Sequence, residues 1–286
     1  MWRTLRLTLI DVEPDLVIVL GDTNSTLAGA LAAAKLGIPV AHVEAGLRSF
    51  DRSMPEELNR VLTDHAADLL FCPTQTAVDH LTNEGLDERA RLTGDIMYDA
   101  LREQLPQAER SDIVARLGLT ARGYALATVH RAANTDDADA LGRIVAAFGQ
   151  LEETVVFPAH PRVRAAMDAS GLTAAENVRV IEPVGYVEML ALERSARVVL
   201  TDSGGVQKEA FLLGVPCVTL REETEWPETA HDSWNVLAGS DSDRILEAAM
   251  RTAPAGEPPA AFGDGRAGQR MVEFLRDDPR HGTRRR

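Results

Sequence analysis

Short apolar runs alternate with helical patterns along most of this chain, and the alternation limits the possible folds more than any other feature. Apolar runs bounded by helical patterns are typical of parallel strands that are covered on both faces. The runs form a first series, Leu16–Leu20, Pro39–Val43, Leu69–Phe71 and Arg91–Leu92, and a second series, Ala125–Val129, Val155–Phe157, Val178–Ile181, Val198–Leu200 and Val215–Leu220. The sequence therefore predicts an α/β fold.

The two series predict two Rossmann-like domains, residues 1–110 and residues 111–262, within a length that is comfortable for two domains. The junction is the polar segment Leu101–Asp112, which has no strand signal. A last helix, at about residues 266–276, is expected to pack back on the first domain. Only a helix-like segment, Trp2–Ile10, precedes the first strand signal, so the first sheet is expected to be short.

The composition excludes several partners. With 30 basic and 44 acidic residues the net charge is −14, which disfavours nucleic acid and anionic membranes. An anionic ligand would therefore need local arginines and helix N-termini. Cys72 and Cys217 lie in apolar runs and are expected to be buried, and the His and Cys spacing predicts no metal site. With no apolar stretch of membrane-span length and no signal-peptide pattern at Met1–Ile10, we expect the cytosol.

A glycine-rich turn at Thr201–Glu209 connects the strand Val198–Leu200 to a helix that begins near Val206. Free N–H groups and the helix dipole converge at such a point, which suits a phosphate. Ser203, Gly204 and Gly205 are the candidate phosphate ligands, and Glu209 could accept hydrogen bonds from ribose hydroxyls. An ordinary turn capped by Ser203 fits the same residues.

Three carboxylates follow strands of the first domain. Asp22 comes directly after the first strand, and the next strand carries His42 and Glu44 two residues apart, hence on the same face. Glu56 opens the next helix, where an acid could equally stabilise the helix dipole. Acids gathered at the carboxyl edge of a sheet suit proton transfer to and from a carbon.

Basic residues end strands of the second domain. His130 and Arg131 follow its first strand and His160 follows the next, at the same expected edge. The segment Leu220–Glu228 contains Arg221 and Trp226 and is either a solvated loop or a cover for a sugar or base, with Trp226 as the platform. The other histidines have no evident partner; they are His65, His80, His231 and His281.

Six motifs occur in order and together resemble the non-hydrolysing UDP-N-acetylglucosamine 2-epimerases from about Pro14 to Leu275. They are Gly21-Asp22-Thr23, His42-Val43-Glu44-Ala45-Gly46-Leu47-Arg48, Pro55-Glu56-Glu57-x-Asn59-Arg60, Val129-His130-Arg131, Asp202-Ser203-Gly204-Gly205-x-Gln207-x-Glu209 and Thr224-Glu225-x-Pro227-Glu228. The resemblance implies a glycosyltransferase-B arrangement of the two domains, with the active site in the cleft between them. It also implies a homodimer that uses no nicotinamide and no metal.

The reaction implied by the resemblance is the interconversion of UDP-N-acetylglucosamine and UDP-N-acetylmannosamine, which supplies polysaccharide or glycan synthesis. UDP leaves C1 as the C2 proton is removed, and UDP adds back to the resulting glycal after protonation from the opposite face. By the same resemblance Asp22, Glu44 and Glu56 have acid/base and positioning roles, and His130 assists the leaving group. Arg131, His160 and Arg221 are further candidates for holding the substrate, together with the phosphate and ribose ligands of the glycine turn.

The sequence departs from the family pattern at three places. Trp226 stands where the family usually has Arg, and Ala133 where it usually has Glu. The opening strand and loop with Gly-Thr-Arg-Pro-Glu have no counterpart, so the first domain is expected to lack its opening strands, on the order of 70 residues at about 30 residues per βαβ unit. Other functions stay open: a hydrolysing epimerase, a 2,3-diacetamido-uronate nucleotide epimerase, a truncated UDP-binding protein without activity, and, less favoured, a glycosyltransferase.

Overall fold

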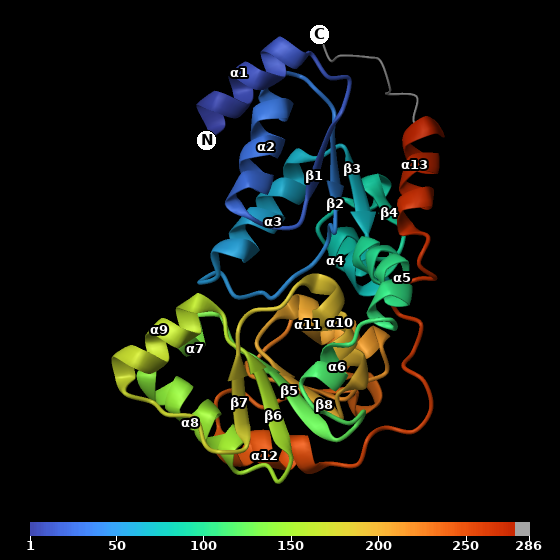
Figure 1. The fold of residues 1–286 in the computed structure, drawn as a ribbon. Helices are drawn as coiled ribbons and strands as arrows, with labels where there is room; N and C mark the ends of the chain where they lie inside the picture. The colour runs from blue at the N-terminus through green and yellow to red at the C-terminus, as the bar shows by residue number, and fades with distance from the viewer. Residues whose placement is uncertain (278–286) are drawn as a thin grey trace. The chain divides into compact units, whose positions relative to one another are not determined.

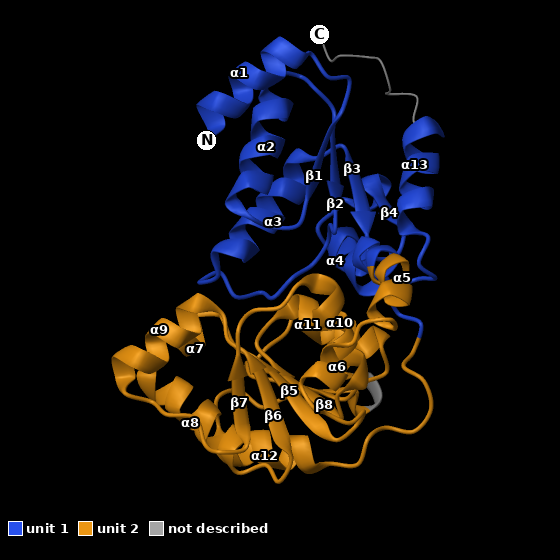
Figure 2. Ribbon diagram, in the orientation of Figure 1, with its two compact units in different colours: residues 1–100, 260–286 blue, residues 101–259 orange. Residues whose placement is uncertain are grey.

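The structure is a computed structural model that describes residues 1–277, without the side chains of His231 and Asp232. His281 lies outside the described residues. The chain divides into unit 1, residues 1–100 and 260–286, and unit 2, residues 101–259 (Figure 2). The division falls within helix α5 (Ile96–Ala108), which includes much of the segment that the sequence suggested as a polar junction.

Unit 1 contains a four-stranded parallel sheet whose strands follow one another in sequence order (Figure 1). Parallel neighbours need crossover connections, and helices supply them here. The strands are β1 (Val17–Leu20), β2 (Val40–Val43), β3 (Leu69–Cys72) and β4 (Ala90–Leu92). The helices are α1 (Trp2–Val12), α2 (Asn24–Lys35), α3 (Pro55–Ala66), α4 (Gln75–Asn83), the 3₁₀ turn η1 (Asp87–Arg89) and α13 (Ala267–Asp277).

The two faces of the unit 1 sheet are covered unequally. Helix α13 packs on the face that carries Ala41 and Val43, and α3 meets His42 on the other face. Ile18 and Leu20 of β1 lie in register with Ala41 and Val43 but are exposed. The β1 edge of this sheet is therefore only partly covered.

Unit 2 contains a six-stranded parallel sheet in the order β10-β9-β8-β5-β6-β7. The strands are β5 (Tyr124–Thr128), β6 (Thr154–Pro158), β7 (Val178–Ile181), β8 (Val198–Thr201), β9 (Cys217–Thr219) and β10 (Asn235–Leu237). The helices are α6 (Ile113–Arg116), α7 (Ala132–Thr135), α8 (Ala138–Gly149), α9 (Pro161–Ser170), α10 (Tyr186–Ser195), α11 (Gly204–Leu212), the 3₁₀ turn η2 (Pro227–Ser233) and α12 (Ser242–Met250).

Both faces of the unit 2 sheet are buried under helices. One core contains Leu141 and Phe148 of α8 with Ile245 of α12, and the opposite core contains Leu190 of α10 with Ala210 of α11. The strand order changes direction between β5 and β8. In open α/β sheets ligands bind at the carboxyl ends of the strands beside such a point.

The predicted α/β class is confirmed: all nine apolar runs form strands of two parallel sheets. The sequence missed strand β10 and helix α12, and it did not predict that α5 is helical around Pro106. Cys72 and Cys217 are buried and free, as expected. Within the described part of the chain, no helix has the length and apolar character that crossing a bilayer requires.

Candidate active site

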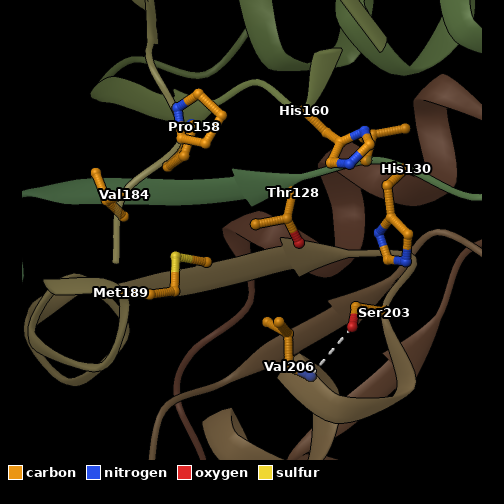
Figure 3. Close-up of a pocket in the computed structure, with 10 residues that line it drawn as sticks. Thr128, His130, Pro158, His160, Val184, Met189, Ser203 and Val206 are labelled. Atoms are coloured by element: carbon orange, nitrogen blue, oxygen red, sulfur yellow. Dashed lines mark hydrogen bonds between the residues drawn. The ribbon is translucent and has the colours of Figure 1, made fainter. Parts of the chain in front are cut away.

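The glycine turn of unit 2 has the geometry of an anion site. Ser203 caps α11, because its Oγ accepts a hydrogen bond from the Val206 N–H at 3.4 Å (Figure 3). A Cβ on Gly204 would lie 2.5 Å from Oε1 of Glu225, so no side chain fits at that position without a shift of the carboxylate. Gly204 and Gly205 form the first turn of α11, where N–H groups have no partner within the helix.

The Asp202 carboxylate organises the residues that follow β5. It accepts hydrogen bonds from the backbone N–H groups of His130 and Arg131, at 3.0 to 3.1 Å, and from the Asn134 amide at 3.0 Å. Nδ1 of His130 lies 3.1 Å from Asp202 Oδ1. Burial alone would raise the pKa of Asp202, but the hydrogen bonds and charge of His130, with the other donors, hold it below its usual value. An ionised Asp202 therefore fixes His130 through Nδ1 and leaves Nε2 available for a ligand.

Arginines and a carboxylate gather beside the same turn. Glu225 lies 2.8 Å from Nη1 of Arg221 and 3.3 Å from Nη2 of Arg131. Trp226 is 3% exposed, and the Lys208 ammonium lies 3.8 Å from the centre of its ring. The indole is therefore no open platform for a sugar or base, which corrects that interpretation of Leu220–Glu228. Cationic side chains therefore lie around the turn, although the net charge of the chain is negative.

Glu209 lies one turn into α11 and is largely buried. Its Oε1 accepts a hydrogen bond from the Tyr186 hydroxyl at 2.8 Å. Burial, and then the charge of Glu209 and this hydrogen bond, raise the pKa of Tyr186, so the phenol keeps its proton. Tyr186 thus orients the carboxylate that we expected to meet ribose hydroxyls, a role that the sequence did not suggest.

A pocket of about 220 Å³ opens beside the turn in unit 2. Its walls combine apolar side chains with His130, His160 and Ser203, which come from the ends of three neighbouring strands (Figure 3). Nδ1 of His160 accepts a hydrogen bond from the Arg162 N–H and caps α9. The remaining lining residues are Thr128, Val129, Pro158, Pro183, Val184, Met189 and Val206.

In unit 1, Glu44 lies beside Gly21, the residue that precedes Asp22. Strand β2 ends at Val43 and Glu44 has φ of 70°, so the alternation that placed it on the face of His42 does not extend to it. Its Oε2 nevertheless lies 3.6 Å from where a Cβ on Gly21 would be, and His42 Nε2 lies 2.8 Å from the Gly21 carbonyl. A left-handed conformation in a residue with a Cβ is strained and is typical of functional sites.

Arg60 connects Asp22 to helix α3. Its Nη2 donates to Oδ2 of Asp22 at 2.7 Å, and Nη1 lies 3.4 Å from Oε2 of Glu57. Glu57 in turn accepts hydrogen bonds from the N–H groups of Ser49 and Phe50. These contacts thus connect Glu57, the neighbour of the predicted Glu56, to Asp22. Glu56 itself lies in the first turn of α3.

A buried ionic network supports the carboxylates of Asp22, Glu44 and Glu57. Asp64 accepts hydrogen bonds from His42 Nδ1 at 2.6 Å, from Arg48 Nη1 at 2.7 Å and from the Gly46 N–H at 3.2 Å. Both ring nitrogens of His42 therefore lie at hydrogen-bond distance from oxygen atoms, because Nε2 is 2.8 Å from the Gly21 carbonyl. Burial alone would raise the pKa of Asp64, but His42 and Arg48 hold it below its usual value.

Sequence reasoning found the candidate site residues but missed the residues that orient them. Asp202 can be paired with His130 only when β8 is known to lie next to β5, and Asp64 with His42 only when α3 is known to cover β2. His80 also has a partner, because its Nδ1 lies 3.0 Å from the Gly46 carbonyl. Within residues 1–277, no group of three His, Cys, Asp or Glu side chains could hold a metal ion.

Comparisons with known proteins identify close relatives. The sequence pattern of a family described as UDP-N-acetylglucosamine 2-epimerase matches residues 2–276. A Methanococcus maripaludis protein named UDP-N-acetylglucosamine 2-epimerase homolog is 50% identical over 97% of this chain and 80% of its own length. A UDP-2,3-diacetamido-2,3-dideoxy-D-glucuronate 2-epimerase of Pseudomonas aeruginosa is 47% identical over 93% of this chain and 76% of its own.

Solved structures also resemble the chain. The UDP-GlcNAc 2-epimerase of Methanocaldococcus jannaschii, in complex with UDP-GlcNAc and UDP, superposes with a TM-score of 0.88 at 40% identity. The enzyme of Neisseria meningitidis bound to UDP-GlcNAc gives a TM-score of 0.87 at 31% identity. Each match covers 97% of this chain and 80% of the other.

Proposed function

The chain belongs to the UDP-N-acetylglucosamine 2-epimerase family, and on that premise we propose that it interconverts UDP-N-acetylglucosamine and UDP-N-acetylmannosamine. The observation that carries the proposal is the set of carboxylate side chains in unit 1. Glu44 Oε2 lies beside Gly21, and the adjacent Asp22 is held by Arg60 at 2.7 Å. Inverting a carbon requires one group to remove a proton and another to return one from the opposite face, and carboxylates can do both.

The chemistry requires a leaving group as well as a base. The C2–H electron pair forms the C1–C2 double bond of a glycal while the C1–O pair departs with UDP. A proton then returns to C2 on the other face, and the UDP oxygen adds back to C1. We assign the proton transfers and the positioning of the sugar to Asp22, Glu44 and Glu56. The reaction requires no external oxidant or reductant.

Unit 2 is proposed to hold the UDP. The diphosphate would accept hydrogen bonds from the helix N–H groups at Ser203, Gly204 and Gly205, with Arg131 and Arg221 balancing its charge. His130, which Asp202 orients, would stabilise or protonate the departing oxygen. Glu209 would accept from the ribose, and the pocket that His160 lines has apolar walls suited to a flat base.

Isotope exchange tests the reaction directly. With UDP-N-acetylglucosamine in deuterated water, NMR should show deuterium at C2 and the appearance of UDP-N-acetylmannosamine. A folded sample that binds UDP but exchanges no deuterium would support a binding protein without activity. Accumulation of free UDP and N-acetylmannosamine would instead indicate a hydrolysing epimerase.

A second substrate belongs in the same experiment because the Pseudomonas relative is nearly as similar as the first. Its name specifies a UDP-2,3-diacetamido uronate. Comparing kcat/KM for the two nucleotide sugars decides between them, and we expect the higher value for UDP-N-acetylglucosamine.

We also propose that the chain acts as a homodimer in the cytosol. The dimer is an implication of the family resemblance, and analytical ultracentrifugation would test it. The two free, buried cysteines suit a reducing compartment. Burial raises the pKa of each thiol to about 12, which keeps both unreactive.

A further inference from the structure

Phe50 is an exposed aromatic residue in a strained backbone conformation. Its side chain is 73% exposed and its φ is 60°. A Cβ disfavours the left-handed region, and an exposed ring gains little from packing. Neither local geometry nor core formation therefore accounts for phenylalanine at this position. Strain of this kind is concentrated at ligand-binding sites.

The Phe50 ring is nevertheless held in place. The His80 ring on α4 meets it edge to face, with the ring centres 5.3 Å apart. His80 is itself fixed, because its Nδ1 donates a hydrogen bond to the Gly46 carbonyl at 3.0 Å. Gly46 is anchored in turn by its N–H on Asp64 and by close packing on Ala77. The exposed ring is thus supported from the buried network of unit 1.

The backbone of Phe50 is hydrogen-bonded to Glu57, one of the carboxylates of unit 1. Its N–H donates to Glu57 Oε1 at 3.0 Å, and the Ser49 N–H donates to Glu57 Oε2 at 2.9 Å. Through Arg60, Glu57 is connected to Asp22. The loop that carries Phe50 joins strand β2, which ends just before Glu44, to helix α3, whose second residue is Glu56. The ring therefore stands on the segment between two of the proposed acid/base residues.

We propose that Phe50 is a platform for the sugar of the nucleotide sugar, a residue that determines substrate affinity in the epimerase reaction. The carboxylates can bind sugar hydroxyls, but they offer nothing to the apolar C–H face of the pyranose or to the acetamido methyl group. An aromatic face supplies that contact, and C–H groups approach its negative π surface favourably. This inference rests on the proposed function.

The test separates the sugar from the UDP. Calorimetry would give the Kd of UDP-N-acetylglucosamine and of UDP for the wild type and for Phe50→Ala. We expect roughly a tenfold weaker Kd for the nucleotide sugar and an unchanged Kd for UDP, since UDP has no sugar to contact the ring. Phe50→Tyr should bind as the wild type does. Leu62→Ala, another exposed apolar residue of unit 1, is the matched control and should change neither Kd.

Two further variants address structure. Phe50→Gly relieves the left-handed strain, so its Tm should rise by about 2 °C although it binds the nucleotide sugar as weakly as Phe50→Ala. His80→Ala should weaken sugar binding less, and adding it to Phe50→Ala should cause no further loss, because it acts through the ring.

The outcomes are distinguishable. Equal weakening of both ligands by Phe50→Ala would mean that the loop is disturbed, and unchanged binding of both would mean that the ring touches no sugar; either result overturns the platform. A shift in the sedimentation of Phe50→Ala with normal sugar binding would identify Phe50 as a subunit contact and also overturn it. A wild type that binds UDP but not the nucleotide sugar would refute the proposed function itself.

Discussion

The candidate sites of the two units present opposite chemical groups. In unit 2, the buried carboxylate of Asp202 and the carboxylate of Glu225 orient donors: backbone N–H groups, a histidine and two arginines. In unit 1, buried cations orient acids, as Arg60 does with Asp22. A set of donors suits an anion, and a set of acids suits proton transfer. The difference in construction thus agrees with a division of labour between binding UDP and transforming the sugar.

The largest expected effect separates these two roles. Glu44→Gln removes a proposed acid/base group without altering unit 2, so kcat should fall by on the order of 10² to 10⁴. The Kd of UDP should stay within twofold of the wild type. NMR assays of deuterium exchange at C2 give the rate, and calorimetry gives the affinity.

Gly204→Ala is the matched variant of unit 2. Its Cβ would lie 2.5 Å from the Glu225 carboxylate, so UDP binding should suffer first. Gly142→Ala places a Cβ at an ordinary contact distance of 3.7 Å within helix α8 and serves as the control. If Glu44→Gln weakened UDP binding as much as Gly204→Ala does, the division of labour would be wrong.

The next effect concerns stability. Asp64 is fully buried against His42 and Arg48, so Asp64→Asn removes the buried negative charge from both pairs, although Arg48 keeps its hydrogen bonds to Glu84. The free energy of unfolding should fall by about 3 to 5 kcal/mol in urea denaturation. Because the folded pKa of Asp64 is lowered, its contribution is present above the unfolded value of 3.8 and is lost as the pH falls through the folded pKa. The difference between wild type and variant should therefore disappear in strong acid.

Asp202→Asn offers the comparison in unit 2. Asp202 is equally buried, but most of its donors are neutral N–H groups, which an asparagine oxygen can still accept. We expect a smaller loss, about 1 to 2 kcal/mol. An equal loss in both variants would mean that the two sites are supported in the same way.

How much of this contrast could be foreseen depends on whether a feature is local. The strands and the turn at Thr201–Glu209 are local features, because apolar runs and glycines within the segments themselves predict them. Helix α5 was missed because Pro106 and polar residues hide its pattern, and the three-residue strand β10 was missed because it is too short for periodicity. The pairs Asp202–His130 and Asp64–His42 join residues 72 and 22 positions apart, and only the sheet order and the helix covering it bring them together.

Phe50 illustrates a different limit. Its sequence context marks a loop, but the left-handed φ and the support from His80 depend on the surrounding fold. The same holds for Glu44, whose conformation ends the alternation on which the sequence argument depended. Strained residues are the ones for which local rules fail, and both of these follow strand β2 in the chain.

A further effect on stability, which depends on pH, comes from a carboxyl group that fits neither pattern. Glu193 on α10 is fully buried, and neither of its oxygens has a hydrogen-bond partner among the described residues. Burial, and then the negative charge of Glu209, raise its pKa well above the usual 4.5. The folded chain therefore keeps a proton that the unfolded chain releases above about pH 4.5. The free energy of unfolding should decrease as the pH rises from there toward the folded pKa, by up to about 1.4 kcal/mol per pH unit.

Glu193→Gln removes that proton uptake, so the variant should gain stability over the wild type as the pH rises from 4.5 to 7.5. Urea unfolding at intervals of one pH unit would measure the difference. Glu188→Gln, on the surface of the same helix beside Arg116, is the matched control and should follow the wild-type curve within about 1 kcal/mol. Parallel curves for Glu193→Gln and the wild type would show that Glu193 is ionised in the folded state. A cation would then have to compensate it, and unit 2 would share the construction of unit 1.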